Sequence, residues 1–133
     1  MSARYALLIY TDNDLWEREV GEAGQQQQMV DYGAYTNHLV QSGAMKGGEP
    51  LQPTTTATTV RLRQGQRLIS DGPFAETKEA LGGFYVVEAK DLAEAIDLAA
   101  RCPGAKTGAI EVRPIMELPA EYAMPEQATA TAH

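Results

Sequence analysis

Apolar positions along this 133-residue chain fall into short runs that predict β-strands at three places. Residues 5–10 (YALLIY) and 83–89 (GFYVVEA) carry apolar side chains at both odd and even positions. That pattern is typical of strands buried on both faces. Residues 109–116 form the third predicted strand, which ends the ordered part of the chain.

A β-hairpin is predicted between the first two of these strands. Residues 54–62 are rich in threonine and β-branched side chains, and residues 67–70 return after the turn at 64–66 (QGQ). The preceding stretch, residues 44–53, contains two prolines and two adjacent glycines, and it predicts a loop or an irregular strand.

Two helices are predicted from patterns with a period near 3.6 residues. The first covers residues 25–42 and ends at Gly43, with a stripe formed by Met29, Tyr32, Gly33, Thr36, Leu39 and Val40. The second begins after Asp91, where Glu94 completes a capping box, and it ends before Pro103. Its narrow stripe consists of Leu92, Ala95, Ile96, Ala99 and Ala100.

The resulting order of strand, helix, hairpin, strand, helix and strand predicts a βαββαβ-like α+β sandwich with an elaborated hairpin. Two helices can cover only one face of such a sheet. Because the strands at 5–10 and 83–89 are apolar on both faces, the second face also needs a cover. We therefore expect a homodimer in which the same sheet faces of two copies pack together.

The length fits one domain, which we place at residues 1–118, followed by a flexible tail at residues 119–133 that is rich in alanine and threonine. No run approaches the roughly 20 apolar residues that span a membrane, and residues 1–5 lead directly into a strand without a signal-peptide pattern. The single cysteine, Cys102, has no partner for an internal disulfide. A cytoplasmic protein without membrane association is the expectation.

The charge and the metal-ligating residues exclude further classes of function. The net charge is −7 without a basic cluster, so we expect no direct binding to nucleic acid. The chain has two histidines, His38 and His133, and no calcium loop or glycine-rich nucleotide motif, so we predict no metal and no cofactor. Cys102 is expected to fill a small apolar space at a helix end, not to act as a nucleophile.

The densest group of charged residues lies at 71–79 (DGPFAETKE), followed by Gly82 and Gly83. Asp71 has two interpretations: its carboxylate caps the turn by accepting the Phe74 N–H, or it lies at the mouth of a cleft as a base or hydrogen-bond acceptor. Both interpretations can hold together. The two glycines are expected to relieve crowding where another backbone approaches.

Four further residues are candidates for ligand binding, each with a structural alternative. Glu76 and Lys78 bind a polar ligand, form ion pairs across the dimer, or belong to a solvated helical turn. Arg113 either binds an anion or pairs with a carboxylate, which is Glu111 on the same strand face or else Asp71 or Glu76. Tyr10 either lines the cleft or packs in the core. No nucleophile, base and orienting group can be assembled from the motif.

The motifs DGPFAETKE at 71–79 and LGGFY at 81–85 resemble the YCII-related (YciI-like) proteins, specifically their DGPF-motif branch. The similarity covers about residues 4–118 and includes LLIY at 7–10, GGEPLQP at 47–53, TATTVR at 56–61 and EVRPIME at 111–117. This resemblance implies a ferredoxin-like fold that dimerises as an α+β barrel. It implies no established activity, although DGPF relatives are often encoded beside extracytoplasmic-function sigma factors.

The YciI-type branch of that family carries a His and an Asp proposed as an active-site pair. In this sequence Cys102-Pro103 stands where that branch has Asp-Pro, and the histidine position falls near Tyr32, so we do not carry the pair over. Two functions remain open. The protein binds or converts a small polar or anionic molecule beside residues 71–79, or it is an accessory protein that acts on sigma-factor transcription through a protein partner.

Overall fold

The computed structural model describes residues 2–12 and 21–123 of the chain. Its main body is a four-stranded antiparallel sheet in the order β2-β5-β1-β6. The strands are β1 (Ala3–Asp12), β2 (Met45–Pro50), β5 (Glu79–Ala89) and β6 (Ala109–Pro114). All three predicted strands are therefore confirmed, and the irregular stretch before the hairpin also joins the sheet as β2.

The two helices, α2 (Gly21–Gln41) and α3 (Leu92–Ala100), connect these strands in the order β1-α2-β2 and β5-α3-β6. In each unit the two strands have a third strand between them, β5 in the first and β1 in the second. This mixed α+β arrangement is compatible with a ferredoxin-like fold. The last predicted section, residues 119–133, contains a short 3₁₀ turn, η4 (Ala120–Tyr122), and residues 124–133 lie outside the described part.

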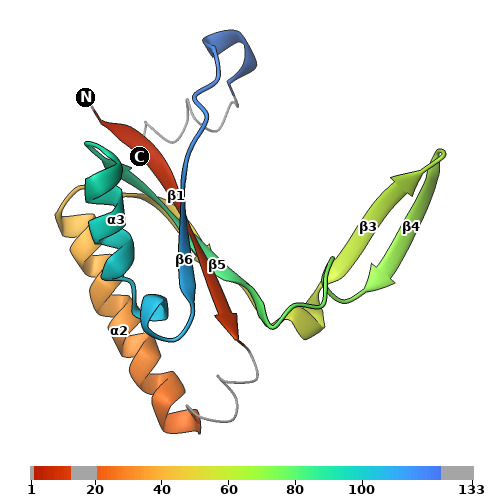
Figure 1. Cartoon of the computed structure of the whole chain (residues 1–133), viewed down its shortest axis with the longest axis horizontal. Helices are drawn as coiled ribbons and strands as arrows, with labels where there is room; N and C mark the ends of the chain where they lie inside the picture. The colour runs from red at the N-terminus through yellow and green to blue at the C-terminus, as the bar shows by residue number, and fades with distance from the viewer. Residues whose placement is uncertain (1, 13–20, 124–133) are drawn as a thin grey trace.

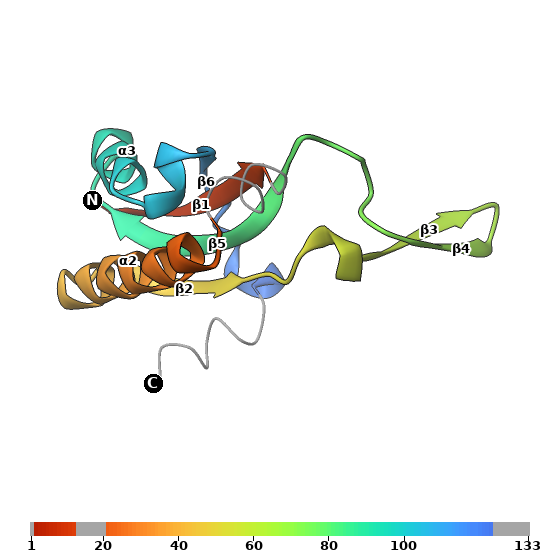
Figure 2. The same cartoon turned by 90° about the horizontal axis from the view of Figure 1, so that it is seen from below.

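Both helices lie on the same side of the sheet (Figures 1 and 2). The core between them and the sheet contains one side of β1, whose Tyr5, Leu7 and Ile9 are buried, together with Tyr35 and Leu39 of α2. The predicted stripe on α2 is only partly correct. Met29 and Val40 are exposed, the buried residues of this helix are Tyr35 and Leu39, and Tyr32 packs partly buried beside them. An aromatic residue with a hydroxyl can pack in the core and still place its polar atom on a partner.

The predicted capping box at the start of α3 is confirmed. The Glu94 N–H donates to Asp91 Oδ1 at 2.9 Å, and the Lys90 N–H donates to Glu94 Oε1 at 3.1 Å. The Glu94 N–H, one of the otherwise unpaired N–H groups in the first turn, is thereby satisfied, while the Glu94 carboxylate accepts from Lys90, one residue before the cap. The stripe is shifted, since Ala95, Leu98 and Ala99 are buried while Leu92 and Ile96 are half-exposed.

The predicted hairpin is present as β3 (Thr58–Arg63) and β4 (Gln66–Asp71), which form a separate two-stranded sheet. The turn at Gln64 and Gly65 has positive φ at both residues, as a tight hairpin with a right-handed twist requires. A 3₁₀ turn, η2 (Thr54–Thr56), leads into it. We call residues 54–74 the arm, because this segment extends away from the body of the protein (Figure 1).

The sheet face opposite the helices, which we call the open face, is apolar in its middle. Ala6 pairs with Val86 and Leu8 with Phe84, so these four side chains share one face of β1 and β5. Within the described residues no helix covers this face (Figure 1). The prediction of a second apolar face is thus confirmed, whereas its cover by a second copy stays a prediction.

Candidate functional site

Three polar side chains lie together at the border of the open face. Tyr10 comes from β1, and Glu111 and Arg113 come from the neighbouring strand β6. Arg113 Nη2 donates to Glu111 Oε2 at 2.6 Å, and the Tyr10 hydroxyl lies 3.4 Å from Glu111 Oε1. The predicted pairing of Arg113 with Glu111 is confirmed, and Tyr10 lies beside this ion pair outside the buried core.

The ion pair affects the protonation of both partners. The hydrogen bond from Arg113 holds the pKa of Glu111 below its usual value, and the same bond raises the pKa of Arg113. Both side chains are substantially exposed, at 64% for Arg113 and 41% for Glu111. Because they are exposed, both groups are accessible to a ligand or a second chain. Their ion pair contributes little to the stability of the fold.

Asp71 is the last residue of β4 and lies at the base of the arm. The corner after it is made by Gly72, whose φ of +98° is accessible to glycine at little cost. The Gly72 N–H donates to the Ala57 carbonyl at 2.8 Å, and the Thr59 hydroxyl donates to the Gly72 carbonyl at 2.8 Å.

The predicted hydrogen bond from the Phe74 N–H to the Asp71 carboxylate is absent, so the capping interpretation of Asp71 is wrong in this chain. Within residues 2–12 and 21–123 the carboxylate has no hydrogen bond, and the side chain is exposed. The corner is held instead by the backbone of Gly72, through its hydrogen bonds to Ala57 and Thr59. Asp71 is therefore an exposed acid on a backbone fixed by its neighbours.

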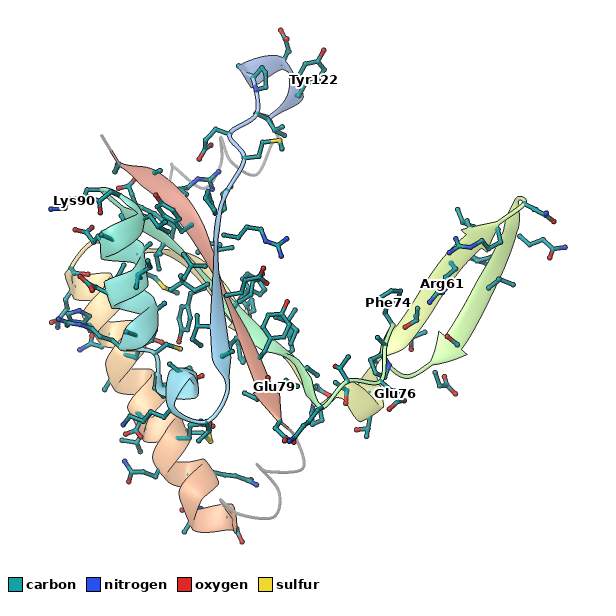
Figure 3. The ribbon with its side chains drawn as sticks, in the orientation of Figure 1. Arg61, Phe74, Glu76, Glu79, Lys90 and Tyr122 are labelled. Atoms are coloured by element: carbon teal, nitrogen blue, oxygen red, sulfur yellow. The ribbon has the colours of Figure 1, made fainter. Side chains whose placement is uncertain are left out.

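Glu76 and Lys78 lie on the exposed segment that returns from the arm to the sheet. This segment is solvated, as expected, but it is not helical, because its backbone bends without forming a helical turn. The Thr77 hydroxyl donates to the Glu79 carbonyl at 2.6 Å, where β5 begins. Figure 3 shows Glu76 at the base of the arm, with Glu79 at the end of the sheet.

An aromatic contact that the sequence analysis missed lies next to this segment. The guanidinium carbon of Arg61 lies 5.1 Å from the centre of the Phe74 ring, a distance typical of a cation–π contact (Figure 3). Phe74 is nevertheless 75% exposed. The sequence contains a signal for this contact, because Phe74 is a large apolar residue within the charged motif at 71–79. A turn with only a structural role does not need such a side chain.

The residues of the predicted site form two separate groups within one chain. Asp71, Glu76 and Lys78 belong to the charged motif at 71–79, and Tyr10 and Arg113 belong to the open face. In the register of the sheet, Glu79 lies opposite Asp12 of β1, whereas Arg113 lies opposite Ala6 of the same strand. Six residues of β1 separate these levels, a distance of about 20 Å at the rise of an antiparallel strand. Tyr10 lies only two residues from Asp12 and is the member of the open-face group nearest to the motif. Neither Asp71 nor Glu76 is a partner of Arg113 in the described chain, contrary to the alternative considered from the sequence.

The expected cleft beside residues 71–79 does not coincide with either of two concavities that the described chain forms on the helical side of the sheet. These two concavities have volumes of about 540 and 520 Å³. None of the five predicted site residues lines either of them. His38 and Arg101 border both grooves, and their side chains are 3.1 Å apart. His38 itself is exposed, in agreement with its position on a polar helix face.

The described residues contain no group of three or more His, Cys, Asp or Glu side chains that could hold a metal ion. In the same part of the chain, no helix has the length and apolar character needed to span a membrane. Cys102 is buried at the end of α3, and burial raises the pKa of its thiol. Its predicted role as a small apolar residue is consistent with that position.

Gly83 confirms the predicted close approach of another backbone. A Cβ atom at this position would lie 3.0 Å from the Glu49 carbonyl oxygen and 3.3 Å from Pro50 Cα. β5 is irregular here, because its pairing with β1 shifts between Ile9 and Tyr10. The two glycines thus allow β2 and β1 to flank the start of β5 where the motif enters the sheet.

Comparison with known proteins gives two results. The sequence profile of the YCII-related domain matches residues 3–119. An uncharacterised protein of Rhizobium meliloti (strain 1021) is 40% identical over 116 residues, which cover 84% of this chain and 90% of that protein. The match to the YCII-related domain includes the open face, the arm and the charged motif.

Proposed function

The chain belongs to the YCII-related family, and from this premise we propose that it is a small homodimeric protein that binds or converts a small polar or anionic molecule without a cofactor. The binding cleft lies beside residues 71–79 and is completed when two copies assemble. The motif at 71–74 (DGPF) supports placing the chain in the DGPF branch of the family. A cytoplasmic location, expected from the single cysteine, belongs to the same proposal.

One observation carries the proposal: an apolar open face bordered by exposed charged groups. Ala6, Leu8, Phe84 and Val86 form the middle of this face, with the Arg113–Glu111 ion pair beside them. Apolar strand faces normally pack on another layer. A second copy related by two-fold symmetry provides such a layer. The charged groups of both copies then lie around the dimer interface.

The roles of the site residues follow from their chemistry. Arg113 offers a planar set of donors for a carboxylate or phosphate, and Lys78 offers a mobile positive charge. Asp71 acts as the base or as a hydrogen-bond acceptor, since its carboxylate has no hydrogen bond within the described residues. Glu76 and Tyr10 provide further polar contacts at the two sides of the cleft.

A thermal-shift screen with small carboxylates and phosphates tests this function. A ligand at one hundred times its dissociation constant raises the free energy of unfolding by about 2.7 kcal/mol, which is easily measured as a higher Tm. In the Asp71→Asn and Arg113→Gln variants we expect the shift to disappear. The Tm without ligand should change little, because exposed substitutions of this kind usually cost less than about 0.5 kcal/mol.

The matched control is Asp97→Asn, an exposed acid on α3 on the other side of the sheet, which should retain the full shift. A large loss of stability in Asp71→Asn with an unchanged ligand-induced shift would assign Asp71 a structural role instead. The proposal is wrong if no compound in the screen raises the Tm of the wild-type protein.

The alternative function is a non-catalytic accessory protein linked to sigma-factor transcription. It is favoured by the exposure of Phe74 beside Glu76, because an exposed aromatic ring with adjacent charges is typical of protein contacts. A pull-down that recovers one protein, and loses it when Glu76 and Glu79 are changed to lysine, would favour this function. Binding of a small molecule with no protein recovered would favour the first.

A further inference from the structure

The arm presents an apolar face that is exposed in the single chain. Val60 pairs with Ile69 and Leu62 with Arg67, so Val60, Leu62 and Ile69 share one face of the hairpin. Their exposed fractions are 58%, 67% and 61%. Leu68 and Phe74 are also exposed, at 47% and 75%, on other parts of the arm. Such a concentration of exposed apolar side chains in one short segment is typical of an interaction surface.

Within the described residues, the two strands of the arm do not join the main sheet. Strands β3 and β4 pair with each other, and two hydrogen bonds at their base join Gly72 to Ala57 and Thr59, which are both residues of the arm. The backbone hydrogen bond of the main sheet that lies nearest to the arm joins the Leu51 N–H to the Gly82 carbonyl. An isolated two-stranded hairpin is only marginally stable in water, so the arm needs a surface on which to pack.

The charge of the arm indicates which surface this is. Residues 54–74 contain three of the 11 basic residues and one of the 18 acidic residues, so the arm has a net charge of +2. The rest of the chain, with eight basic and 17 acidic residues, has a net charge of −9. A basic arm and an acidic body of the same sequence are electrostatically complementary across two copies.

The open face alone provides little new buried area for a stable dimer. Leu8, Phe84 and Val86 are only partly exposed before any association. A typical stable interface buries roughly 800 Å² on each partner. The arm holds more strongly exposed apolar side chains than the face does, and it projects to the same side of the sheet as the open face (Figure 1).

We propose that the arm docks on the body of a second copy of this chain, with the two arms exchanged around the two-fold axis. This inference rests on the proposed homodimer and adds the element that holds it together. Asp71 pairs with Thr58 and lies on the same face of the hairpin as Val60 and Ile69. Docking that buries this face therefore brings Asp71 to the surface of the partner, so that both copies contribute to one site.

Photo-crosslinking tests the docking directly. Leu62 is replaced by a benzophenone amino acid in two preparations of the protein, one with ordinary nitrogen (light) and one labelled with nitrogen-15 (heavy). The two preparations are mixed so that the dimers exchange subunits, and the mixture is then irradiated. We expect crosslinks between light and heavy chains that join the arm to residues of the body. Crosslinks confined to one chain, in a protein that sediments as a dimer, would overturn the exchanged arm and leave the dimer standing. Sedimentation as a single chain would overturn both.

A pair of substitutions provides an independent readout. Val60→Asp with Ile69→Asp is expected to raise the dimer dissociation constant at least about tenfold, and to speed tryptic cleavage after Arg61, Arg63 and Arg67 by a similar factor. The body should still fold, because neither residue belongs to its core.

Met29→Asp, at a 76% exposed position of α2, is the matched control and should change neither value. The same dissociation constant and cleavage rate in the arm variant and the control would overturn the docking.

Discussion

Individual side chains in this protein differ in whether their polar atoms are satisfied within the chain. The buried Tyr35 hydroxyl donates to the Leu98 carbonyl at 2.7 Å, and the Tyr85 and Thr36 hydroxyls lie 2.7 Å apart. Burial raises the pKa of both tyrosines, which therefore stay neutral in the core. Asp71, by contrast, is exposed without a hydrogen bond in the described part of the chain, which suits a residue that acts on something outside it.

A prediction at this scale concerns Cys102, which is 1% exposed. Because burial raises the pKa of the thiol, less of the reactive thiolate is present at any given pH. We expect iodoacetamide at pH 8 to alkylate the native protein at least about one hundred times more slowly than the protein in concentrated urea. Equal rates in the two conditions would contradict the buried position.

At the scale of elements, the helices show which local signals are reliable. Both ends of α3 follow the sequence, since Asp91 and Glu94 cap its start and the chain turns at Cys102-Pro103 after its end. The faces of the helices follow it less well, because Leu92, Ile96 and Met29 point to solvent. Capping depends on neighbouring residues alone, whereas the buried face depends on how the helix lies on the sheet.

The cap of α3 gives the second prediction. Asp91→Ala removes the acceptor of the Glu94 N–H and should lower the free energy of unfolding by about 1 kcal/mol, measured in urea at fixed protein concentration. Asp91→Asn should restore most of the loss, because asparagine caps helices about as well as aspartate. Asp97→Ala, at an exposed position inside the helix, is the control and should cost nothing. No difference between Asp91→Ala and this control would contradict the role of the cap.

At the scale of the whole molecule, the described residues cover one face of the sheet with helices and leave the other face open. The helices and the core lie on one side, while the open face and the projecting arm share the other (Figure 1). The charged motif connects these two parts, because it begins at the end of β4 and leads into β5. Assembly of two copies is therefore the step that the proposed site requires.

The third prediction follows from this arrangement. We expect the wild-type protein to sediment as a dimer at micromolar concentration, and Leu8→Asp to sediment as a folded single chain. A charge at the middle of the open face has no partner in a packed interface, which makes association unfavourable. Circular dichroism shows whether the variant remains folded. A wild-type protein that is monomeric at this concentration would contradict the dimer and the cleft built on it.

The sequence by itself determined the features that depend on local chemistry. These are the order of strands and helices, the hairpin, the cap at Asp91, the crowding at Gly83 and the Arg113–Glu111 pair, whose members are two residues apart on one strand. Period-2 and period-3.6 patterns, turn residues and short spacings carry this information directly. The apolar character of both faces of β1 was also evident from the sequence.

Only the tertiary structure decided where these elements lie relative to one another. It showed that the hairpin leaves the body as an arm, that Gly72 and not the Asp71 carboxylate holds the corner, and that Arg113 is far from residues 71–79 in the same chain. Such relations depend on strand register and on long-range packing, and a single residue of register changes the position of every side chain after it.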